Sequence, residues 1–266
     1  MTSFRGKRSL PLKPFKDNMT YTLGVKAGDL RGLFVNVGHR GFPLAEPENT
    51  IRSFLKAFES GATAIEMDVR ATADGHLVLM HDESVDRTTD GHGLVSELTL
   101  RELKSLDAGK GERVPTLSEA LSAVRGRGGI DLDLKVSGYA KEVVKETRGL
   151  TEYVYVTSSS PEILLEVKEE EPGLRLGLIL KGEPFRNMEL AREIGASAVV
   201  PRFDLLTNEL MRRARELGLE VYVWTVNTEG DILRALSLGV DGIITDNPPL
   251  VARILRERAP SRGLAL

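Results

Sequence analysis

The sequence predicts an α/β protein that folds as a closed (β/α)8 TIM barrel, and two observations support this prediction. Short runs rich in β-branched residues alternate with amphipathic helical stretches, and strands that alternate with helices form parallel βαβ units. Eight such runs fit into about 230 residues, which is the size of one closed barrel. The runs are Leu33–Gly38, Ala64–Arg70, Ile130–Lys135, Tyr153–Thr157, Arg175–Leu180, Ala198–Arg202, Glu220–Val226 and Gly242–Thr245.

The stretches between these runs have the apolar spacing of helices, and four are followed by a glycine that suits a helix C-terminus, at Gly61, Gly195, Gly218 and Gly239. An open doubly wound sheet is the alternative fold. Such a sheet usually carries a phosphate-binding glycine loop after its first strand, and the segment Gly38–Gly41 does not match that loop. The helical stretches include Pro47–Ser60, Ser118–Arg125, Glu162–Glu170, Met188–Glu193, Asn208–Leu217 and Glu229–Leu238.

Composition and charge exclude several classes of protein. The 266 residues contain no cysteine, which removes disulfides, thiolate metal sites and a cysteine nucleophile. No run of about 18 uncharged apolar residues is present, so we expect no membrane-spanning helix. Met1–Thr20 has a basic start without an apolar core after it, so we expect no secretory leader. The absence of cysteine favours a cytoplasmic location. Residues 1–32 carry a net charge of +5 and residues 33–266 one of −8. We therefore expect a basic N-terminal extension before a single barrel domain at residues 33–266, which has no nucleic-acid partner.

Ionisable residues gather at the ends of the first two predicted strands, where barrel enzymes carry their catalytic groups. His39 and Arg40 follow the first strand and have glycines on both sides, which allow a ligand to approach closely. Glu66 and Asp68 stand two residues apart on the second strand and therefore share one face. Two carboxylates this close in a buried strand favour a cation between them.

A short β-hairpin is predicted directly after the second strand, because Asp74–Gly75 is a favoured two-residue turn. With that turn, Asp68 faces His81 across the hairpin. The first strand is the neighbour of the second, so His39 is expected close by. Two histidines thus converge on two carboxylates.

The third and seventh predicted strands add further candidates. Asp131, Asp133 and Lys135 alternate with leucines and therefore share one face of the third strand. Charged groups on a buried strand need partners, either a cation with an anionic ligand or an ion-pair network inside the barrel. Trp224 ends the seventh strand, where it either fills the core or packs against the apolar part of a ligand.

The charged groups at these strand ends fall into three chemical sets. Glu66, Asp68 and Asp133 offer the oxygen ligands of a hard divalent cation. Arg40 and Lys135 can hold a phosphate group. The two histidines at the first strand and the hairpin can act as acid and base near neutral pH. This equipment is typical of metal-assisted cleavage of a phosphodiester.

Further motifs follow one another along the chain from about Val37 to Pro249. They include His39–Arg40–Gly41, Pro47–Glu48–Asn49–Thr50, Ile65–Glu66-x-Asp68–Val69, His81–Asp82, Arg87–Thr88–Thr89, Trp224–Thr225–Val226–Asn227 and Asp241–Gly242–Ile243–Ile244–Thr245–Asp246. In this order they resemble the signature of the glycerophosphodiester phosphodiesterases. Residues 1–32 lie outside the resemblance.

The resemblance implies a (β/α)8 barrel that hydrolyses small-molecule glycerophosphodiesters to an alcohol and sn-glycerol 3-phosphate. It also implies a divalent cation, commonly Mg²⁺ or Ca²⁺, with Mn²⁺ as a further candidate. His39 and His81 would form the acid–base pair, although some descriptions of the family place the second histidine with the metal. Arg40 would contact the phosphate, and Glu66 and Asp68 would bind the metal.

The chain departs from the family pattern on the third strand. The family usually carries Asn-x-Glu-x-Lys there, and this chain has Asp131-x-Asp133-x-Lys135. Asp133 therefore stands in the place of a metal-binding glutamate and is one methylene shorter. Asp131 adds negative charge where the family has a neutral amide.

Three alternatives remain at this level. Related barrels attack with a hydroxyl of the substrate and release a cyclic phosphate, and a lysophospholipase D would act on longer-chain substrates. A barrel that binds a metabolite without turning it over is the third. The sequence does not specify the leaving alcohol.

Overall fold

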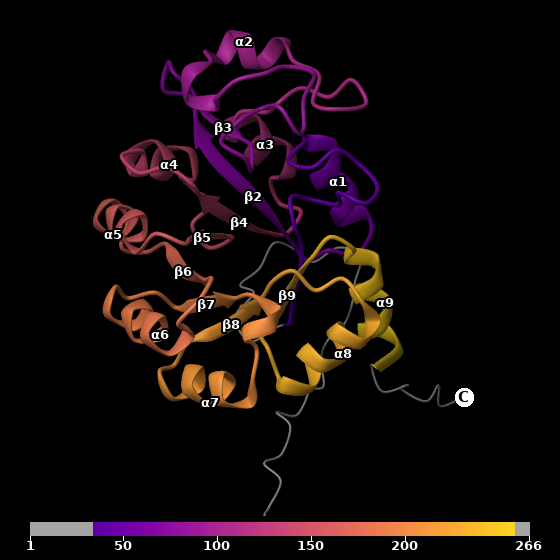
Figure 1. The fold of residues 1–266 in the computed structure, drawn as a ribbon, viewed down its shortest axis with the longest axis vertical. Helices are drawn as coiled ribbons and strands as arrows, with labels where there is room; N and C mark the ends of the chain where they lie inside the picture. The colour runs from indigo at the N-terminus through magenta and orange to yellow at the C-terminus, as the bar shows by residue number, and fades with distance from the viewer. Residues whose placement is uncertain (1–33, 259–266) are drawn as a thin grey trace, which may run out of the picture.

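The computed structural model describes residues 34–258, so the expected basic extension at residues 1–32 lies outside the described residues (Figure 1). The strands are β1 (Val35–Gly38), β2 (Ala64–Ala71), β3 (Leu77–Leu79), β4 (Gly129–Leu134), β5 (Val154–Ser158), β6 (Arg175–Leu180), β7 (Ala198–Pro201), β8 (Glu220–Val223) and β9 (Gly242–Thr245). The sheet order is β1-β9-β8-β7-β6-β5-β4-β2-β3. The parallel pairing of β1 with both β2 and β9 closes the sheet, which confirms the predicted (β/α)8 barrel.

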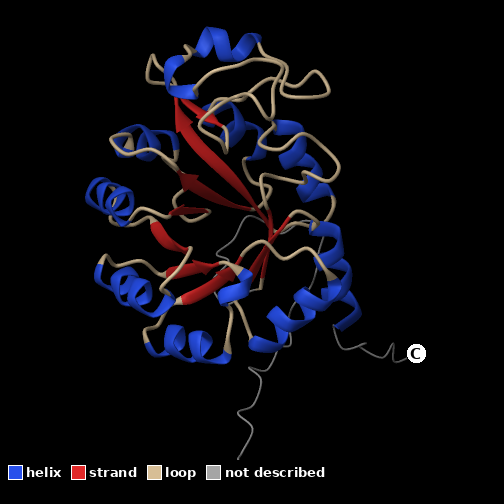
Figure 2. Cartoon of the chain, viewed as in Figure 1, coloured by secondary structure: helices blue, strands red, loops and turns tan. Residues whose placement is uncertain are grey.

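Helices cover the outside of the barrel (Figure 2). Six of them begin after a serine or threonine whose side chain accepts a hydrogen bond from the first turn. The helix over residues 140–146 begins after Tyr139 without such a bond, so the sequence carries no start signal for it. The helices are α1 (Ile51–Glu59), α2 (Leu100–Ser105), α3 (Leu117–Val124), α4 (Ala140–Glu146), α5 (Pro161–Glu170), α6 (Pro184–Glu193), α7 (Asn208–Glu216), α8 (Glu229–Leu238) and α9 (Pro248–Arg258).

Apolar side chains form three clusters in the described part of the chain. The largest lies between the strands and the surrounding helices and includes Phe54, Met67 and Leu132, each fully buried. A smaller cluster comes mainly from alternate strand residues such as Val37 and Tyr222. The third lies under the segment between β2 and α3. This segment, residues 72–116, is a small insertion with its own core, seen at the top of Figure 1.

The hairpin after β2 forms, but its predicted register is wrong by one residue. Val69 pairs with Leu79 and Ala71 with Leu77, so Asp68 does not face His81. The connection has three residues instead of two, because the Thr72 N–H donates to the His76 carbonyl oxygen. A two-residue turn of the predicted type needs a positive φ at both central positions, and only Gly75 of the Asp74–Gly75 pair has one.

The insertion packs against the loop that joins β1 to α1. Lys110 donates to the Ala45 carbonyl oxygen and pairs with Glu46 at 3.0 Å, and Arg87 binds Glu48. Both loops follow the carboxyl ends of barrel strands, so these contacts enclose one side of the barrel mouth. Among the described residues, no helix is both long and apolar enough to cross a membrane.

Candidate active site

Three buried carboxylates lie together near the carboxyl ends of β2 and β4. Asp68 and Asp133 are direct partners in the parallel pairing of these strands, and Glu66 lies on the same face of β2. One carboxylate oxygen from each residue lies within 4.8 Å of the others. Burial, together with the charge of Asp68, raises the pKa of Glu66 well above its usual value. Burial also raises the pKa of Asp133, and the charge of Asp68 adds to the rise. The carboxylates therefore repel one another without a cation between them.

Two cationic side chains compensate this cluster in part. Lys135 Nζ lies 2.9 Å from Asp68 Oδ1 and also contacts Asp133, while Arg40 Nε lies 3.3 Å from Asp68 Oδ2. Burial alone would raise the pKa of Asp68, but the charges of Lys135 and Arg40 outweigh it and hold that pKa below its usual range.

A divalent cation fits this donor set. Asp68 Oδ1 and Arg40 Nε are buried and have no hydrogen-bond partner, although each lies in an ion pair by distance. Three buried carboxylates supply the hard oxygen ligands that Mg²⁺, Ca²⁺ and Mn²⁺ prefer.

The turn after β1 fixes Arg40 beside the cluster. Arg40 adopts φ +53°, and its backbone N–H donates to Glu66 Oε2 at 2.7 Å. A Cβ added to Gly41 would lie 2.4 Å from Ser53 Oγ, so only glycine allows this close approach to α1. The Arg40 guanidinium also donates to Glu48 Oε1 at 2.9 Å.

Asn49 is a site residue that sequence reasoning did not single out. Its Nδ2 donates to Asp68 Oδ2 at 2.8 Å, and its Oδ1 accepts from the Asp68 backbone N–H at 3.2 Å. The side chain therefore clamps Asp68 from both ends. The sequence signal that could have identified Asn49 is its place in the motif Pro47–Glu48–Asn49–Thr50. The contact with Asp68 that explains this residue forms only in the folded chain.

His39 lies directly after β1 and binds a carboxylate from the opposite end of the chain. Its Nδ1 lies 2.7 Å from Asp246 Oδ1, and Asn227 Nδ2 donates to Asp246 Oδ2 at 2.6 Å. Burial alone would raise the pKa of Asp246, but His39, Asn227 and the charge of Arg40 together outweigh it, and that pKa lies below its usual range. Because an ionised carboxylate only accepts, the proton of a neutral His39 ring sits on Nδ1, and Nε2 is its acceptor nitrogen.

His81 lies two residues after β3 and has the same arrangement. Its Nδ1 lies 2.6 Å from Asp82 Oδ1, and its carbonyl oxygen accepts two bonds from the Arg70 guanidinium at 2.9 and 3.0 Å. Burial lowers the pKa of His81, and the charge of Asp68 offsets this only in part. Despite the shifted register, His81 thus interacts electrostatically with the acidic cluster.

Asp131 on β4, which stands where the family pattern has asparagine, behaves differently from a surface aspartate. Thr157 Oγ1 donates to Asp131 Oδ1 at 2.7 Å. Burial raises the pKa of Asp131 to about 7, with the charges of Asp133 and Asp68 adding to the effect. Much of Asp131 is therefore neutral at pH 7, and it adds less negative charge than its residue type suggests.

Trp224 follows β8, and its indole Nε1 donates to the Val200 carbonyl oxygen at 2.9 Å. Its ring packs against the smaller apolar cluster.

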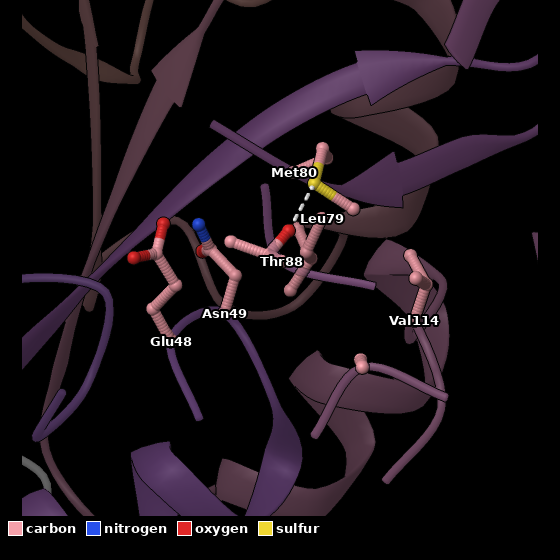
Figure 3. A pocket seen from close by; sticks show the side chains of 7 residues that line it. Glu48, Asn49, Leu79, Met80, Thr88 and Val114 are labelled. Carbon is pink, nitrogen blue, oxygen red and sulfur yellow. Dashed lines mark hydrogen bonds between the residues drawn. The ribbon is translucent and has the colours of Figure 1, made fainter. Parts of the chain in front are cut away.

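Two pockets lie near these groups. The first, of about 220 Å³ including open solvent, is lined by Glu48, Asn49, Met80 and Thr88 among others (Figure 3). It adjoins the acidic cluster, since Glu48 and Asn49 bind Arg40 and Asp68. The second, of about 410 Å³ including open solvent, is largely apolar and is lined by Asp131 together with Val37, Val200 and Tyr222 among others.

At the carboxyl end of a closed barrel, buried carboxylates beside cationic side chains and two histidine–carboxylate pairs are the kind of groups that a hydrolase active site uses. Residues 39–250 match the family model of the Glycerophosphoryl diester phosphodiesterase family, and the chain belongs to this family. The match spans every parallel strand except the first and covers all the site residues named in this subsection.

Relatives of known name support this membership. The chain is 35% identical over 236 residues to a glycerophosphodiester phosphodiesterase of Caldanaerobacter subterraneus subsp. tengcongensis, covering 83% of this chain and 97% of the relative. It is 32% identical over 251 residues to one of Bacillus subtilis, covering 83% and 86%.

Two solved structures share the fold. The glycerophosphodiester phosphodiesterase of Agrobacterium tumefaciens matches with a TM-score of 0.73 and 32% identity, over 82% of this chain and 98% of that one. A phosphodiesterase of Oleispira antarctica, solved in complex with the product sn-glycerol-3-phosphate, matches with a TM-score of 0.78 and 26% identity, over 83% and 96%.

Proposed function

We propose that this protein hydrolyses glycerophosphodiesters to an alcohol and sn-glycerol 3-phosphate with the help of a divalent cation. The observation that carries the proposal is the acidic cluster of Glu66, Asp68 and Asp133 beside two histidine–carboxylate pairs. Family membership and the product bound to the relative from Oleispira antarctica support the same reaction.

Glu66, Asp68 and Asp133 are the residues that would hold the cation. When bound, it would neutralise negative charge on the phosphodiester and draw electrons from the phosphorus. The shorter Asp133 still reaches the other two carboxylates, which supports a working site despite its departure from the family pattern. Mg²⁺, Ca²⁺ and Mn²⁺ all suit these ligands.

Arg40 and Lys135 are the proposed phosphate contacts. Both lie against Asp68, which places two positive charges beside the acidic cluster. A planar guanidinium can bind two phosphoryl oxygens, whereas the ammonium acts as a point charge. Trp224 is the proposed contact for the apolar part of the substrate.

His39 and His81 are the proposed acid–base pair. One Nε2 would take a proton from the attacking water while the new P–O bond forms. The other Nε2 would give a proton to the alcohol oxygen as its bond to phosphorus breaks. Among the described residues, His81 is not part of the group of possible metal ligands within 4.8 Å, which favours the acid–base role.

The test is hydrolysis of glycerophosphocholine by EDTA-treated protein with and without added Mg²⁺, Mn²⁺ or Ca²⁺. A coupled dehydrogenase detects sn-glycerol 3-phosphate, and the ion that restores activity identifies the preferred metal. Absence of product with every ion and with further glycerophosphodiesters would overturn the proposal. Phosphorus NMR of the products separates hydrolysis from release of a cyclic phosphate, which would persist in the spectrum. The cytoplasmic location stays a prediction.

A further inference from the structure

One arginine of the insertion bridges two carboxylates at the barrel mouth. Arg87 Nε and Nη2 donate to Asp82 at 2.6 and 3.1 Å, and its Nη1 and Nη2 each donate to Glu48 at 2.8 Å. All three guanidinium nitrogens are therefore engaged. Such paired bonds fix the direction of a carboxylate as well as attract it.

Both carboxylates also bind residues of the proposed site. Asp82 Oδ1 accepts a hydrogen bond from Arg87 Nη2 and also contacts His81 Nδ1. Glu48 Oε1 accepts hydrogen bonds from the same Arg87 nitrogen and from Arg40 Nη1. One nitrogen of Arg87 thus reaches the two oxygens that orient the acid–base histidine and the phosphate-binding arginine.

The chain therefore contains a continuous series of charged contacts from Arg40 through Glu48, Arg87 and Asp82 to His81. It connects the loop after β1 to the insertion after β2. Among the described residues, no strand pairing joins these two segments. The bond to Arg87 is the largest cause that keeps the pKa of Asp82 below its usual range, so Asp82 remains an acceptor for the histidine.

We propose that Arg87 is a positioning residue that couples the orientation of His81 to that of Arg40 by holding Asp82 and Glu48 in one geometry. This inference rests on the proposed function for its catalytic consequence. Arg87 touches neither substrate nor reacting atoms; it acts through the two carboxylates. A lysine at this position keeps the charge but cannot bind both carboxylates with separate nitrogens.

The primary test follows the imidazole nitrogens by long-range proton–nitrogen NMR. The chain has four histidines, so each ring can be assigned from a single substitution. We expect His81 to carry its proton on Nδ1 in the wild-type protein. In Arg87→Ala we expect a mixture of the two neutral tautomers, because Asp82 no longer holds one direction.

The matched control is Arg253→Ala on α9. Arg253 also bridges two carboxylates, Glu229 and Glu257, and its side chain is 44% exposed against 47% for Arg87. We expect this control to leave the His81 ring signals unchanged. If Arg87→Ala also leaves them unchanged, the inference is overturned.

Kinetics test the catalytic consequence separately. Because loss of an orienting partner typically costs about 10- to 100-fold in activity, we expect kcat/KM to fall by about that factor in Arg87→Ala but not in Arg253→Ala. Guanidinium ion at millimolar concentration should restore part of the loss, which a purely structural defect would not allow. Arg87→Lys should recover less than guanidinium does, and full recovery by lysine would contradict the bridging geometry.

A double-mutant cycle with Asp82→Asn identifies the route. In that background we expect Arg87→Ala to reduce kcat/KM by a smaller factor than in the wild-type protein, because the route through Asp82 is already lost and only the route through Glu48 remains. Fully additive losses would overturn the route through Asp82. An inactive wild-type protein whose His81 tautomer still depends on Arg87 would reject the proposed function and retain the positioning role.

Discussion

Each proposed catalytic histidine has a carboxylate on Nδ1, but the two pairs differ in their surroundings. The His39 side chain is 16% exposed and its partner Asp246 comes from the end of β9. The His81 side chain is 37% exposed and its partner Asp82 is the next residue. One pair is therefore built by the closing of the barrel and the other by the insertion alone.

We expect His39→Ala and His81→Ala each to abolish turnover of glycerophosphocholine while the fold survives. Each substitution removes an Nε2 that the proposed proton transfers require, and neither ring belongs to an apolar cluster. Steady-state assays and circular dichroism check this. Activity near the wild-type level in either variant would contradict the assigned role.

Asp131 predicts a pH dependence of stability in the metal-free protein. Burial raises its pKa to about 7, above the value of about 4 in an unfolded chain. Its contribution to stability is therefore complete below about pH 4 and is lost as the pH rises through about 7. The loss is on the order of 4 kcal/mol at most, since one pKa unit corresponds to about 1.4 kcal/mol.

The check is urea unfolding in EDTA between about pH 5 and about pH 8, an interval that includes the pKa of Asp131 in the folded protein. We expect Asp131→Asn to reduce the fall in unfolding free energy across this interval and to be more stable than the wild-type protein at pH 8. Parallel curves for the two proteins would show that Asp131 does not titrate there.

Among the elements, the turn after β1 and the turn before β3 use glycine for different reasons. Gly41 has φ +89°, and its added Cβ would meet Ser53 at 2.4 Å. Gly75 has φ +80°, and an added Cβ would meet no atom within 4 Å. The first turn must pack closely on α1 to place Arg40, whereas the second needs only the left-handed backbone.

We expect Gly75→Ala to lower the free energy of unfolding by about 1 to 2 kcal/mol, which is the cost of the left-handed conformation. Gly41→Ala should cost clearly more, because its methyl group also overlaps Ser53, and it should reduce activity through Arg40. Urea unfolding of both variants gives the comparison. Equal losses would mean that the turn after β1 moves aside freely.

At the scale of the whole molecule, the closed barrel brings together groups from β1, β2, β4 and β9. The acidic cluster of Glu66, Asp68 and Asp133 repels itself in the folded state, and the unfolded chain does not hold its members together. A cation that binds this cluster therefore binds the folded protein in preference.

We expect a suitable divalent cation at about 100 times its dissociation constant to stabilise the protein by about 2.7 kcal/mol. For a chain of this size that corresponds to a rise in Tm of about 5 to 10 °C, and EDTA should reverse it. Asp133→Ala should abolish the rise. Thermal unfolding of both proteins with Mg²⁺, Ca²⁺ and Mn²⁺ checks this, and an equal rise in the variant would place the cation elsewhere.

The sequence by itself determined the barrel, because alternating β-branched runs and amphipathic stretches are local patterns. It also determined the acidic cluster, since residues two apart on a strand share a face and parallel neighbours end at the same edge. His39, Arg40 and Lys135 followed from the same rule. The start of α4 was not predicted, because Tyr139 provides no capping bond.

Only the tertiary structure decided which groups orient these residues. The partner of His39 lies 207 positions away at Asp246, and no local pattern relates them. The hairpin register depended on whether Asp74 takes a positive φ, and the bond from the Thr72 N–H to His76 settled the three-residue loop. Asn49 and Arg87 gained their contacts when separate loops met at the barrel mouth. Side-chain geometry across such loops depends on packing in three dimensions, which periodicity along the chain does not encode.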